Sequence, residues 1–284
     1  MRKSSVVRLS AAVLVGGALF TAYTQFGNQP AKLDTIKVKD DLYVIHNTFV
    51  PGNTTVLVTN DGVLLVDDKF DIDHASIMAE LKKITDRPVK YVINTHHHAD
   101  HSGGNAKFQA MDAKIVASQE AREQMLVASQ PGLPDIVIEH HANIFLGGKN
   151  VAIYHFGRSH TNGDVVVLFG ADRVLAAGDM FTFGDDVPQL IDYAGGGSAV
   201  EWPLTLRSAL QLDFDTVIPG HGPVATRKDM ADFRESTIRL VARVREMNRA
   251  KKSKDDISKM LAGEFHWAPL QLSRGLNGVI EEAQ

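Results

Sequence analysis

The 284-residue sequence predicts an α+β fold in which two β-sheets pack against each other and helices cover their outer faces. Short apolar runs separated by turn signals are typical of meandering strands, and amphipathic stretches between them are typical of helices. This pattern occurs in two halves that do not repeat each other's sequence. The chain is 44% hydrophobic and has no long internal linker, so one large domain is favoured over two small ones.

The first half begins with short strands and then alternates strands with helices. Turn residues at 39–41, 51–53 and 60–62 separate the first four strands. Apolar residues at helical spacing, with Pro88 just beyond them, predict the first helix, and Ser118 is the expected N-cap of a later one. The expected elements are strands 35–38, 42–46, 55–59 and 63–66, a helix over 72–85, a strand over 89–93, a helix from 103 to 110, a strand over 115–117 and a helix after 118.

The second half has the same character. Its expected strands are 143–145, 151–156, 164–169, 173–176 and 216–218, and its expected helices are 199–211, 228–250 and 255–262. Strands and amphipathic helices in both halves are what a sandwich of two sheets with outer helices requires.

Residues 1–30 have the order of a secretory signal. Basic residues precede an apolar stretch over 9–22, and a polar segment follows. The apolar stretch is short for a membrane-spanning helix, so a cleaved signal is favoured over an uncleaved anchor followed by a linker. In either case residues 31–284 are expected to form the catalytic domain outside the cytoplasm, either periplasmic or secreted. Contact with a membrane is expected only if the segment stays uncleaved.

The composition excludes several chemistries and partners. The chain has no Cys, which excludes disulfides, thiolate metal ligands, a Cys nucleophile and a lipoprotein anchor. The formal net charge of −4 gives no sign of the basic surface that nucleic-acid binding requires. The expected partner is therefore a small-molecule substrate, and no nucleic acid is expected to bind.

The strongest functional signal is a cluster of histidines and an aspartate over residues 95–101, directly after the predicted strand 89–93. Alternate side chains of an extended segment share a side, so His96, His98 and Asp100 are expected to converge while His97 points away. So many donors close together are costly to bury without a cation, and a divalent metal resolves that conflict. The alternative is a solvated His-rich loop.

Three later polar residues also follow or precede predicted strands. His160 lies in a loop between two strands, Asp179 follows the strand over 173–176, and His221 lies between two glycines after the strand over 216–218. Alone, each is more often a turn or capping residue. Together they occur where strands end, so one rim of the paired sheets could gather them, and adjacent glycines allow close backbone approach.

The pattern His96-x-His98-x-Asp100-His101, followed in order by His160, Asp179 and His221, resembles the metallo-β-lactamase superfamily over about residues 35–284. The resemblance implies a four-layer αββα sandwich with a dinuclear metal site at one edge. It implies that His96, His98 and His160 hold the first metal, that Asp100, His101 and His221 hold the second, and that Asp179 bridges the two.

The donor chemistry agrees with this implication. Neutral imidazoles suit zinc, and the carboxylates also admit iron or manganese, so two Zn²⁺ per chain are expected with Fe or Mn as alternatives. A bound metal lowers the pKa of water from about 15.7 to about 7, which supplies a bridging hydroxide that can attack a carbonyl carbon. Asp100 is the expected catalytic residue, because it could orient the hydroxide and later receive a proton.

The substrate stays open at this point. Asp179 stands where some β-lactamases of the family have Cys, and it resembles the ligand of glyoxalase II and the lactonases. Thr182 stands where family members carry a Lys or Tyr that contacts substrate. An exported hydrolase of a β-lactam, lactone or ester is favoured. The alternatives are a thioesterase of glyoxalase II type, whose carboxy-terminal helical region is not recognisable, a mononuclear iron dioxygenase acting on persulfides, and a non-catalytic metal-binding protein.

Other residues receive supporting roles. Asp67 is expected to hold a ligand histidine from behind or to form a turn, and Asp164 receives the same interpretation. Phe49 and Tyr193 either shape the pocket or pack in the core. The segment over 183–199, with Asp185, Asp186 and a glycine triplet at 195–197, contains either a hinge or a turn. The remaining histidines are interpreted as surface or packing residues: His46, His74, His140, His141, His155 and His266.

Overall fold

A computed structural model describes residues 29–47, 50–184 and 189–284. The predicted signal segment up to residue 28, Phe49, Asp185 and Asp186 lie outside the described residues. Among the helices of the described residues, none is both long and apolar enough to span a bilayer.

Two sheets form the centre of the molecule. The seven-stranded sheet has the order β1-β2-β3-β4-β5-β6-β7, and the six-stranded sheet has the order β13-β12-β11-β10-β9-β8. The first contains β1 (Asp34–Lys37), β2 (Leu42–His46), β3 (Thr54–Thr59), β4 (Gly62–Val66), β5 (Val89–Ile93), β6 (Lys114–Ser118) and β7 (Ile136–Ile138). The second contains β8 (His141–Leu146), β9 (Lys149–His155), β10 (Val165–Phe169), β11 (Val174–Gly178), β12 (Thr216–Pro219) and β13 (Ala225–Thr226).

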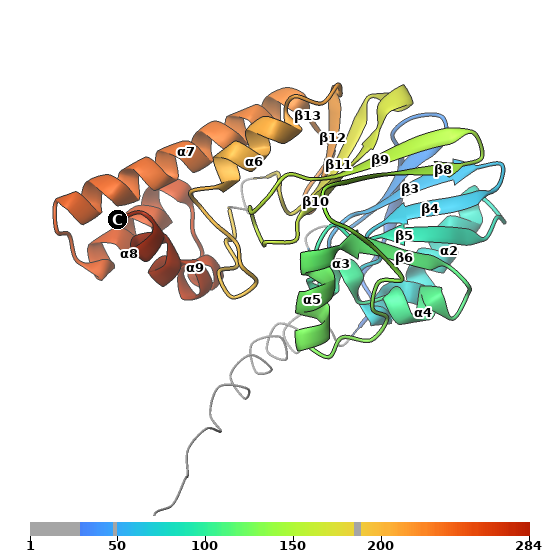
Figure 1. Cartoon of the computed structure of the whole chain (residues 1–284), viewed down its shortest axis with the longest axis horizontal. Helices are drawn as coiled ribbons and strands as arrows, with labels where there is room; N and C mark the ends of the chain where they lie inside the picture. Colours follow the sequence, from blue (N-terminus) through green and yellow to red (C-terminus); the bar gives the residue numbers. More distant parts are fainter. Residues whose placement is uncertain (1–28, 48–49, 185–188) are drawn as a thin grey trace, which may run out of the picture.

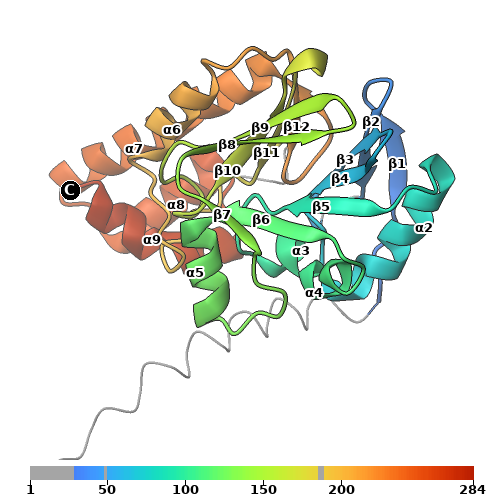
Figure 2. The same ribbon diagram turned by 45° about the vertical axis from the view of Figure 1, so that its right-hand side comes forward.

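Helices cover both outer faces, as Figures 1 and 2 show. The helices are α2 (His74–Ile84), α3 (Ala99–Ser102), α4 (Asn105–Gln109), α5 (Gln119–Val127), α6 (Trp202–Ala209), α7 (Arg227–Arg249), α8 (Lys254–Phe265) and α9 (Pro269–Glu282), with short 3₁₀ turns at Asp71–Asp73 and Gly170–Asp172. Helices α2 and α4 pack on the seven-stranded sheet. Helices α6 and α7 pack on the six-stranded sheet, and α8 and α9 pack against α7 at the end away from the strands.

Alternation along the strands produces the layers. In β4, Leu64 and Val66 pack between the sheets, whereas Val63 and Leu65 pack under α2 and α4. In β11, residues 174 and 176 likewise face the opposite sheet, and residues 175 and 177 face the helices. Successive side chains of a strand point to opposite faces, so each central strand serves two cores. The predicted four-layer αββα sandwich is confirmed.

Most predicted elements lie within one or two residues of the observed ones. Strands 42–46 and 89–93 coincide with β2 and β5, and Ser118 accepts a hydrogen bond from the Ala121 amide as the N-cap of α5. The helix predicted from 103 to 110 corresponds to α4, and the short helix α3 before it was not predicted. Strands β7 and β13 and helix α9 were not predicted, although Pro269 at the start of α9 is a typical N-terminal signal.

The topology brings the ends of several strands to one rim. Strands β4 and β5 are parallel, and so are β11 and β12, so their carboxyl ends lie at the same edges of their sheets. Strand β10 runs antiparallel to β11, which places the loop before β10 beside the end of β11. Every predicted metal-ligand segment therefore leaves the sandwich at this rim.

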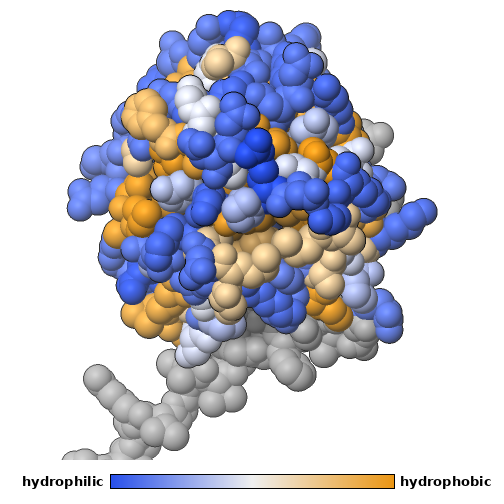
Figure 3. Space-filling view, turned by 90° about the vertical axis from the view of Figure 1, so that its right-hand side faces the viewer, coloured by the Kyte–Doolittle hydropathy of each residue, from blue (hydrophilic) through white to orange (hydrophobic). Residues whose placement is uncertain are grey.

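The face on the right of Figure 1 is mainly hydrophilic, with hydrophobic side chains interspersed (Figure 3). Single exposed apolar residues are normal on soluble proteins.

Candidate metal centre

Three histidines from two segments form the first group of donors. His96 and His98 follow β5, and His160 lies in the loop between β9 and β10. The ring centroid of His96 lies 4.8 Å from that of His98 and 4.9 Å from that of His160. The His98 and His160 centroids are 4.7 Å apart. His160 lies 62 residues after His98 in the sequence, yet the three donors are close enough to hold one ion.

A second group lies beside the first. Asp100 and His101 belong to α3, and His221 follows β12. The Nε2 atoms of His101 and His221 are 3.2 Å apart. The Asp100 Oδ2 atom lies 3.3 Å from the His221 Nε2 atom and 3.7 Å from the His101 Nε2 atom. This group also contains three donors that can face one ion.

Asp179 lies between the two groups. Its Oδ1 atom is 3.3 Å from His101 Nε2 and 3.5 Å from His221 Nε2. Its Oδ2 atom is 3.5 Å from His160 Nε2. The structure thus brings together all seven side chains expected from the sequence, with Asp179 in contact with both groups.

Burial and opposite charges fix the protonation of the cluster. Burial lowers the pKa of His96 well below its usual value, and the neighbouring histidines act in the same direction. Burial also opposes protonation of His221, but the carboxylates of Asp179 and Asp100 raise its pKa to about 10. Burial would raise the pKa of Asp179, yet the charges of His221 and His101 hold it well below its usual range. The cluster thus holds protons that a bound cation would replace.

The donor set fits a divalent cation. The Nε2 atom of His96 is buried and has no hydrogen-bond partner among the described residues. Such buried polar atoms are costly unless something satisfies them. Imidazole nitrogens and carboxylate oxygens in groups of this size are the usual ligands of zinc and related metals.

Asp67 orients His96 and His101 through hydrogen bonds on the side of the rings that faces away from the site. Its side chain accepts hydrogen bonds from the Thr95 amide at 2.7 Å, the Thr95 hydroxyl at 2.8 Å and His101 Nδ1 at 2.8 Å. Because the Thr95 hydroxyl donates to Asp67, it can accept from His96 Nδ1, 3.1 Å away. The Nε2 lone pairs of His96 and His101 then face the site. The predicted supporting role of Asp67 is confirmed.

Asp164 stabilises the turn that carries His160. Its carboxylate accepts hydrogen bonds from the Ser159 hydroxyl and from the Thr161 amide at 2.8 Å and hydroxyl at 2.5 Å. It therefore orders the loop on both sides of His160, and none of its hydrogen bonds reaches the imidazole. Of the two roles expected for Asp164, turn formation is the one that the structure shows, because the loop folds back on its own aspartate.

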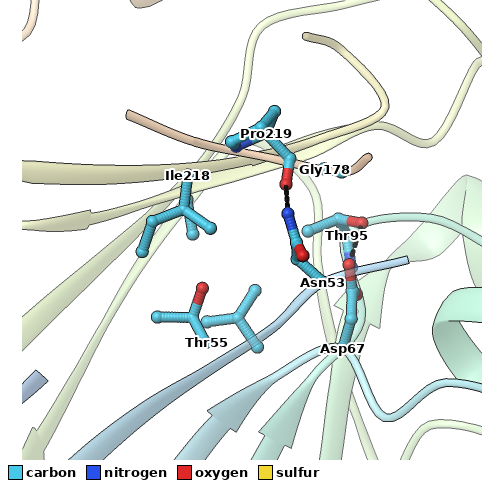
Figure 4. Close-up of a pocket in the computed structure, with 10 residues that line it drawn as sticks. Asn53, Thr55, Asp67, Thr95, Gly178, Ile218 and Pro219 are labelled. Carbon is cyan, nitrogen blue, oxygen red and sulfur yellow. Dashed lines mark hydrogen bonds between the residues drawn. The ribbon is translucent and has the colours of Figure 1, made fainter. Parts of the chain in front are cut away.

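The turn before β3 supports the second group. Asn53 donates from Nδ2 to the carbonyls of Pro219 and Gly222, each at 2.9 Å, and so joins this turn to the one that carries His221. Figure 4 shows Asn53 reaching across the small cavity between the sheets to Pro219. His46 Nδ1 lies 2.9 Å from Asn53 Oδ1, so His46 supports the site from a distance. The sequence carried no signal for Asn53, whose partners lie far along the chain.

Lys69 anchors the same turn. The Lys69 ammonium is fully buried and donates to Asn47 Oδ1 at 2.9 Å and to the Gly52 carbonyl. Burial lowers the pKa of Lys69 to about 7. A Cβ atom on Gly52 would lie 2.2 Å from His101 Cε1, so only glycine fits against that ring. The Lys69 backbone also takes a left-handed conformation, with φ of 61°.

The segment that follows β5 is only partly extended as predicted. His96 and His98 converge as expected, but the chain bends after β5, and Asp100 and His101 are helical rather than extended. His97 lies outside both groups, with its ring centroid 6.3 Å from that of His96. It forms a third set with His98 and Asp192. Asp192, which no sequence signal singled out, accepts a hydrogen bond from His98 Nε2 at 2.8 Å.

Tyr193 and the glycine triplet have structural roles. The Tyr193 hydroxyl donates to Glu282 at 2.8 Å, and its ring contacts α9 at Gly278, so Tyr193 packs. Gly196 has φ of 77°, and the triplet forms a turn against the His160 loop. Thr182 is buried just after Asp179.

The other histidines lie at the surface or in ordinary packing contacts. His74 packs edge-on against Phe108 and His141 stacks on Tyr154, each with centroids 4.6 Å apart. His155 Nδ1 lies 3.5 Å from a Glu120 oxygen. His140 and His266 are exposed.

Comparison with known proteins identifies the class. The family model of the metallo-β-lactamase superfamily matches residues 47–221, which include all seven donors. The chain therefore belongs to the metallo-β-lactamase superfamily. A metallo-β-lactamase type 2 of Elizabethkingia meningoseptica is 26% identical over 211 residues, covering 71% of this chain and 83% of that protein. A metallo-β-lactamase type 2 of Bacillus cereus is 27% identical over 190 residues, covering 63% and 70%. The chain is thus a hydrolase of this superfamily with a candidate metal centre.

Solved structures have the same fold. A metallo-β-lactamase from Pontibacter korlensis superposes with a TM-score of 0.64 at 21% identity, covering 72% of this chain and 99% of that chain. The mono-zinc form of FIM-1 from Pseudomonas aeruginosa superposes with a TM-score of 0.63 at 17% identity, covering 73% and 97%. The family model ends at residue 221, so α7, α8 and α9 lie beyond the part that it matches.

Proposed function

We propose that this chain is an exported hydrolase that uses two metal ions to cleave a small carbonyl substrate, a β-lactam, lactone or ester. The observation that carries the proposal is the position of Asp179 between two complete donor groups. Residues 1–30 would direct export or anchor the chain, and residues 31–284 would form the catalytic domain in the periplasm or outside the cell.

The seven side chains divide between two cations. His96, His98 and His160 would hold the first, Asp100, His101 and His221 would hold the second, and Asp179 would contact both. Zinc is the preferred ion for this many imidazoles, with iron or manganese as alternatives because of the carboxylate ligands. The Asp at position 179 would make the ligand set similar to that of glyoxalase II and the lactonases.

When bound, such cations supply an ionised water at neutral pH and polarise a substrate carbonyl. The protein's own contribution is then to manage protons and orientation. The Asp100 side chain is 21% exposed, more than any of the other six, so it borders the space a substrate would enter. We assign Asp100 the role of orienting the attacking hydroxide, then accepting its remaining proton and delivering that proton to the leaving group.

The relatives guide the choice of substrate. The curated proteins similar to this chain are named metallo-β-lactamases, which places β-lactams first among the small carbonyl compounds to be tested. A mononuclear iron dioxygenase is not favoured, because the second donor group is complete. A glyoxalase II-type thioesterase is not favoured either, because the similar proteins of Elizabethkingia meningoseptica and Bacillus cereus are named metallo-β-lactamases.

The test is to express the full chain, purify the mature protein, determine its first residue, and count bound metals by elemental analysis. Hydrolysis is then measured for β-lactams, lactones, esters and thioesters, together with oxygen consumption on a persulfide. We expect two metals per chain and hydrolysis that His96→Ala abolishes and His266→Ala, at an exposed position, leaves unchanged. One iron per chain with oxygen consumption would overturn the proposal. So would a folded, metal-loaded protein that hydrolyses none of these compounds.

A further inference from the structure

The segment over residues 190–198 lies along the loop that carries His160. The Asp192 amide donates to the His160 carbonyl at 2.9 Å, and the Ser198 amide donates to the Ser159 carbonyl at 2.9 Å. The Asn162 amide donates to the carbonyl of Gly195 at 3.0 Å. Hydrogen bonds along its length thus hold the segment against the first donor group.

Two atoms of this segment orient two of the three histidines. Asp192 Oδ2 accepts from His98 Nε2 at 2.8 Å, and the Leu190 carbonyl accepts from His160 Nδ1 at 2.6 Å. A carbonyl oxygen cannot donate, so His160 must carry its proton on Nδ1 and present its Nε2 lone pair to the site. In the same way His98 presents Nδ1, which lies 2.9 Å from His160 Nε2. The segment therefore sets the tautomers of both rings.

Glycines make this approach feasible. A Cβ atom on Gly197 would lie 2.3 Å from the His160 carbonyl oxygen, and a Cβ atom on Gly195 would lie 2.7 Å from His97 Cε1. The segment is therefore in tight contact with the histidine loops, and a shift of the segment would be transmitted to the rings.

Helix α9 holds the other side of the segment through one carboxylate. Glu282 accepts hydrogen bonds from the Tyr193 hydroxyl at 2.8 Å, the Ala199 amide at 2.9 Å and the Ser198 hydroxyl. The Tyr193 ring lies so close to α9 that a Cβ atom on Gly278 would be 2.3 Å from its Cδ2 atom. Tyr193 directly follows Asp192, and Ser198 donates its own amide to the Ser159 carbonyl, so Glu282 holds the segment next to its contacts with the histidine loop.

We infer that Glu282 is a positioning residue for the first donor group: through the 190–198 segment it holds Asp192 and the Leu190 carbonyl where they orient His98 and His160. The inference rests on the proposed assignment of His98 and His160 as metal ligands. It gives a role in the metal centre to α9, which lies beyond the region that the family model matches.

The test compares Zn²⁺ binding by the wild type, Glu282→Ala and Glu282→Gln, measured by competition with a chromophoric chelator. Loss of outer-shell partners typically weakens metal binding about 10–100-fold, and we expect Glu282→Ala to lose about that much in one of two binding steps. Glu282→Gln keeps an acceptor oxygen and should recover most of the affinity. The matched control is Glu281→Ala, the same change at the neighbouring exposed position of α9, which should bind like the wild type.

A second readout is independent of activity and of metal. Nitrogen-15 spectra of the metal-free protein report which ring nitrogen of each histidine carries the proton. We expect the wild type and Glu281→Ala to hold His160 as the Nδ1-protonated form, and Glu282→Ala to show a mixture of tautomers. If Glu282→Ala does not fold, Tyr193→Phe removes one bond to Glu282 and keeps the ring, and it should show a smaller loss of the same kind.

A double-mutant cycle separates this role from general stabilisation. If Glu282 acts through Asp192, the effects of Glu282→Ala and Asp192→Ala on Zn²⁺ affinity will be clearly less than additive. Additive losses, or Zn²⁺ binding by Glu282→Ala within about twofold of the wild type, would overturn the positioning role alone. Unchanged Zn²⁺ binding by His160→Ala would instead overturn the proposed ligand assignment.

Discussion

The substitution Asp67→Asn tests whether hydrogen bonds behind the histidines set the metal affinity. Three donors converge on the two Asp67 oxygens, the Thr95 amide, the Thr95 hydroxyl and His101 Nδ1, all within 2.7–2.8 Å. An asparagine has one acceptor oxygen and adds an amide donor. If the amide nitrogen faces the Thr95 amide, two donors clash and no histidine proton can relieve the conflict. If it faces the Thr95 hydroxyl and His101 Nδ1, relief requires His101 to move its proton to Nε2, the atom that faces the site.

We expect Asp67→Asn to bind Zn²⁺ about 10–100-fold more weakly, a loss of about 1.4–2.7 kcal/mol of binding free energy. The matched control is Asp68→Asn, at the next residue. Burial raises the pKa of Asp68 well above its usual value, and its Oδ1 atom accepts from the Gly104 amide at 3.0 Å. An asparagine keeps that acceptor oxygen, and Asp68 makes no hydrogen bond to a histidine of the site, so this control should bind Zn²⁺ within about twofold of the wild type.

The assay is chelator competition at pH 7, with metal content checked by elemental analysis and folding checked by circular dichroism. Wild-type affinity in folded Asp67→Asn would refute the reasoning, because the donor conflict would then have no consequence for the site. Equal losses in Asp67→Asn and Asp68→Asn would also refute it, since the effect would come from any change in this buried turn.

Three further predictions concern catalysis, pH and packing. Asp100→Asn should lower turnover by at least about 100-fold while Zn²⁺ binding at the first group stays within about threefold, and equal losses in kinetics and metal analysis would contradict the proton role. Lys69 has a pKa lowered to about 7 from 10.5 by burial, so above pH 7 the unfolded chain binds the extra proton and stability rises with pH. Urea unfolding of the metal-free protein should show that the free energy of unfolding of the wild type rises by about 2 kcal/mol relative to that of Lys69→Met between pH 7.5 and 9. A difference between the two unfolding free energies that stays constant over this range would exclude a buried neutral amine at Lys69. Gly52→Ala would place a Cβ atom 2.2 Å from His101 Cε1 and should cost about 1–3 kcal/mol of unfolding free energy, while Gly170→Ala, with open space around it, should cost far less.

The strand pattern was predictable because its cause is local. Alternation of apolar residues along β4 and β11 follows from the two-residue period of a strand, so the sequence alone indicated two buried sheets. Placement of His160, Asp179 and His221 at strand ends was also visible, and the parallel pairs β4–β5 and β11–β12 explain why those ends meet. Helix α9 was missed although Pro269 and a helical apolar period were present.

The supporting residues were not predictable in the same way. Asp192 lies in a loop without periodicity, and the partner of its carboxylate, His98, is 94 residues away. Asn53 contacts Pro219 across 166 residues. Neither residue type nor neighbouring residues distinguish these two from ordinary turn residues, so only the folded chain identifies them.

The sequence by itself determined the kinds of donor, their order and the class of hydrolase, because residue chemistry and strand periodicity are properties of short stretches. The tertiary structure decided which nitrogen of each imidazole faces the site. That choice depends on acceptors supplied by distant segments, Asp67 for His101, Leu190 for His160 and Asp192 for His98. A ring nitrogen can bind a cation only when its lone pair is free, and hydrogen bonds made on the far side of the ring decide that.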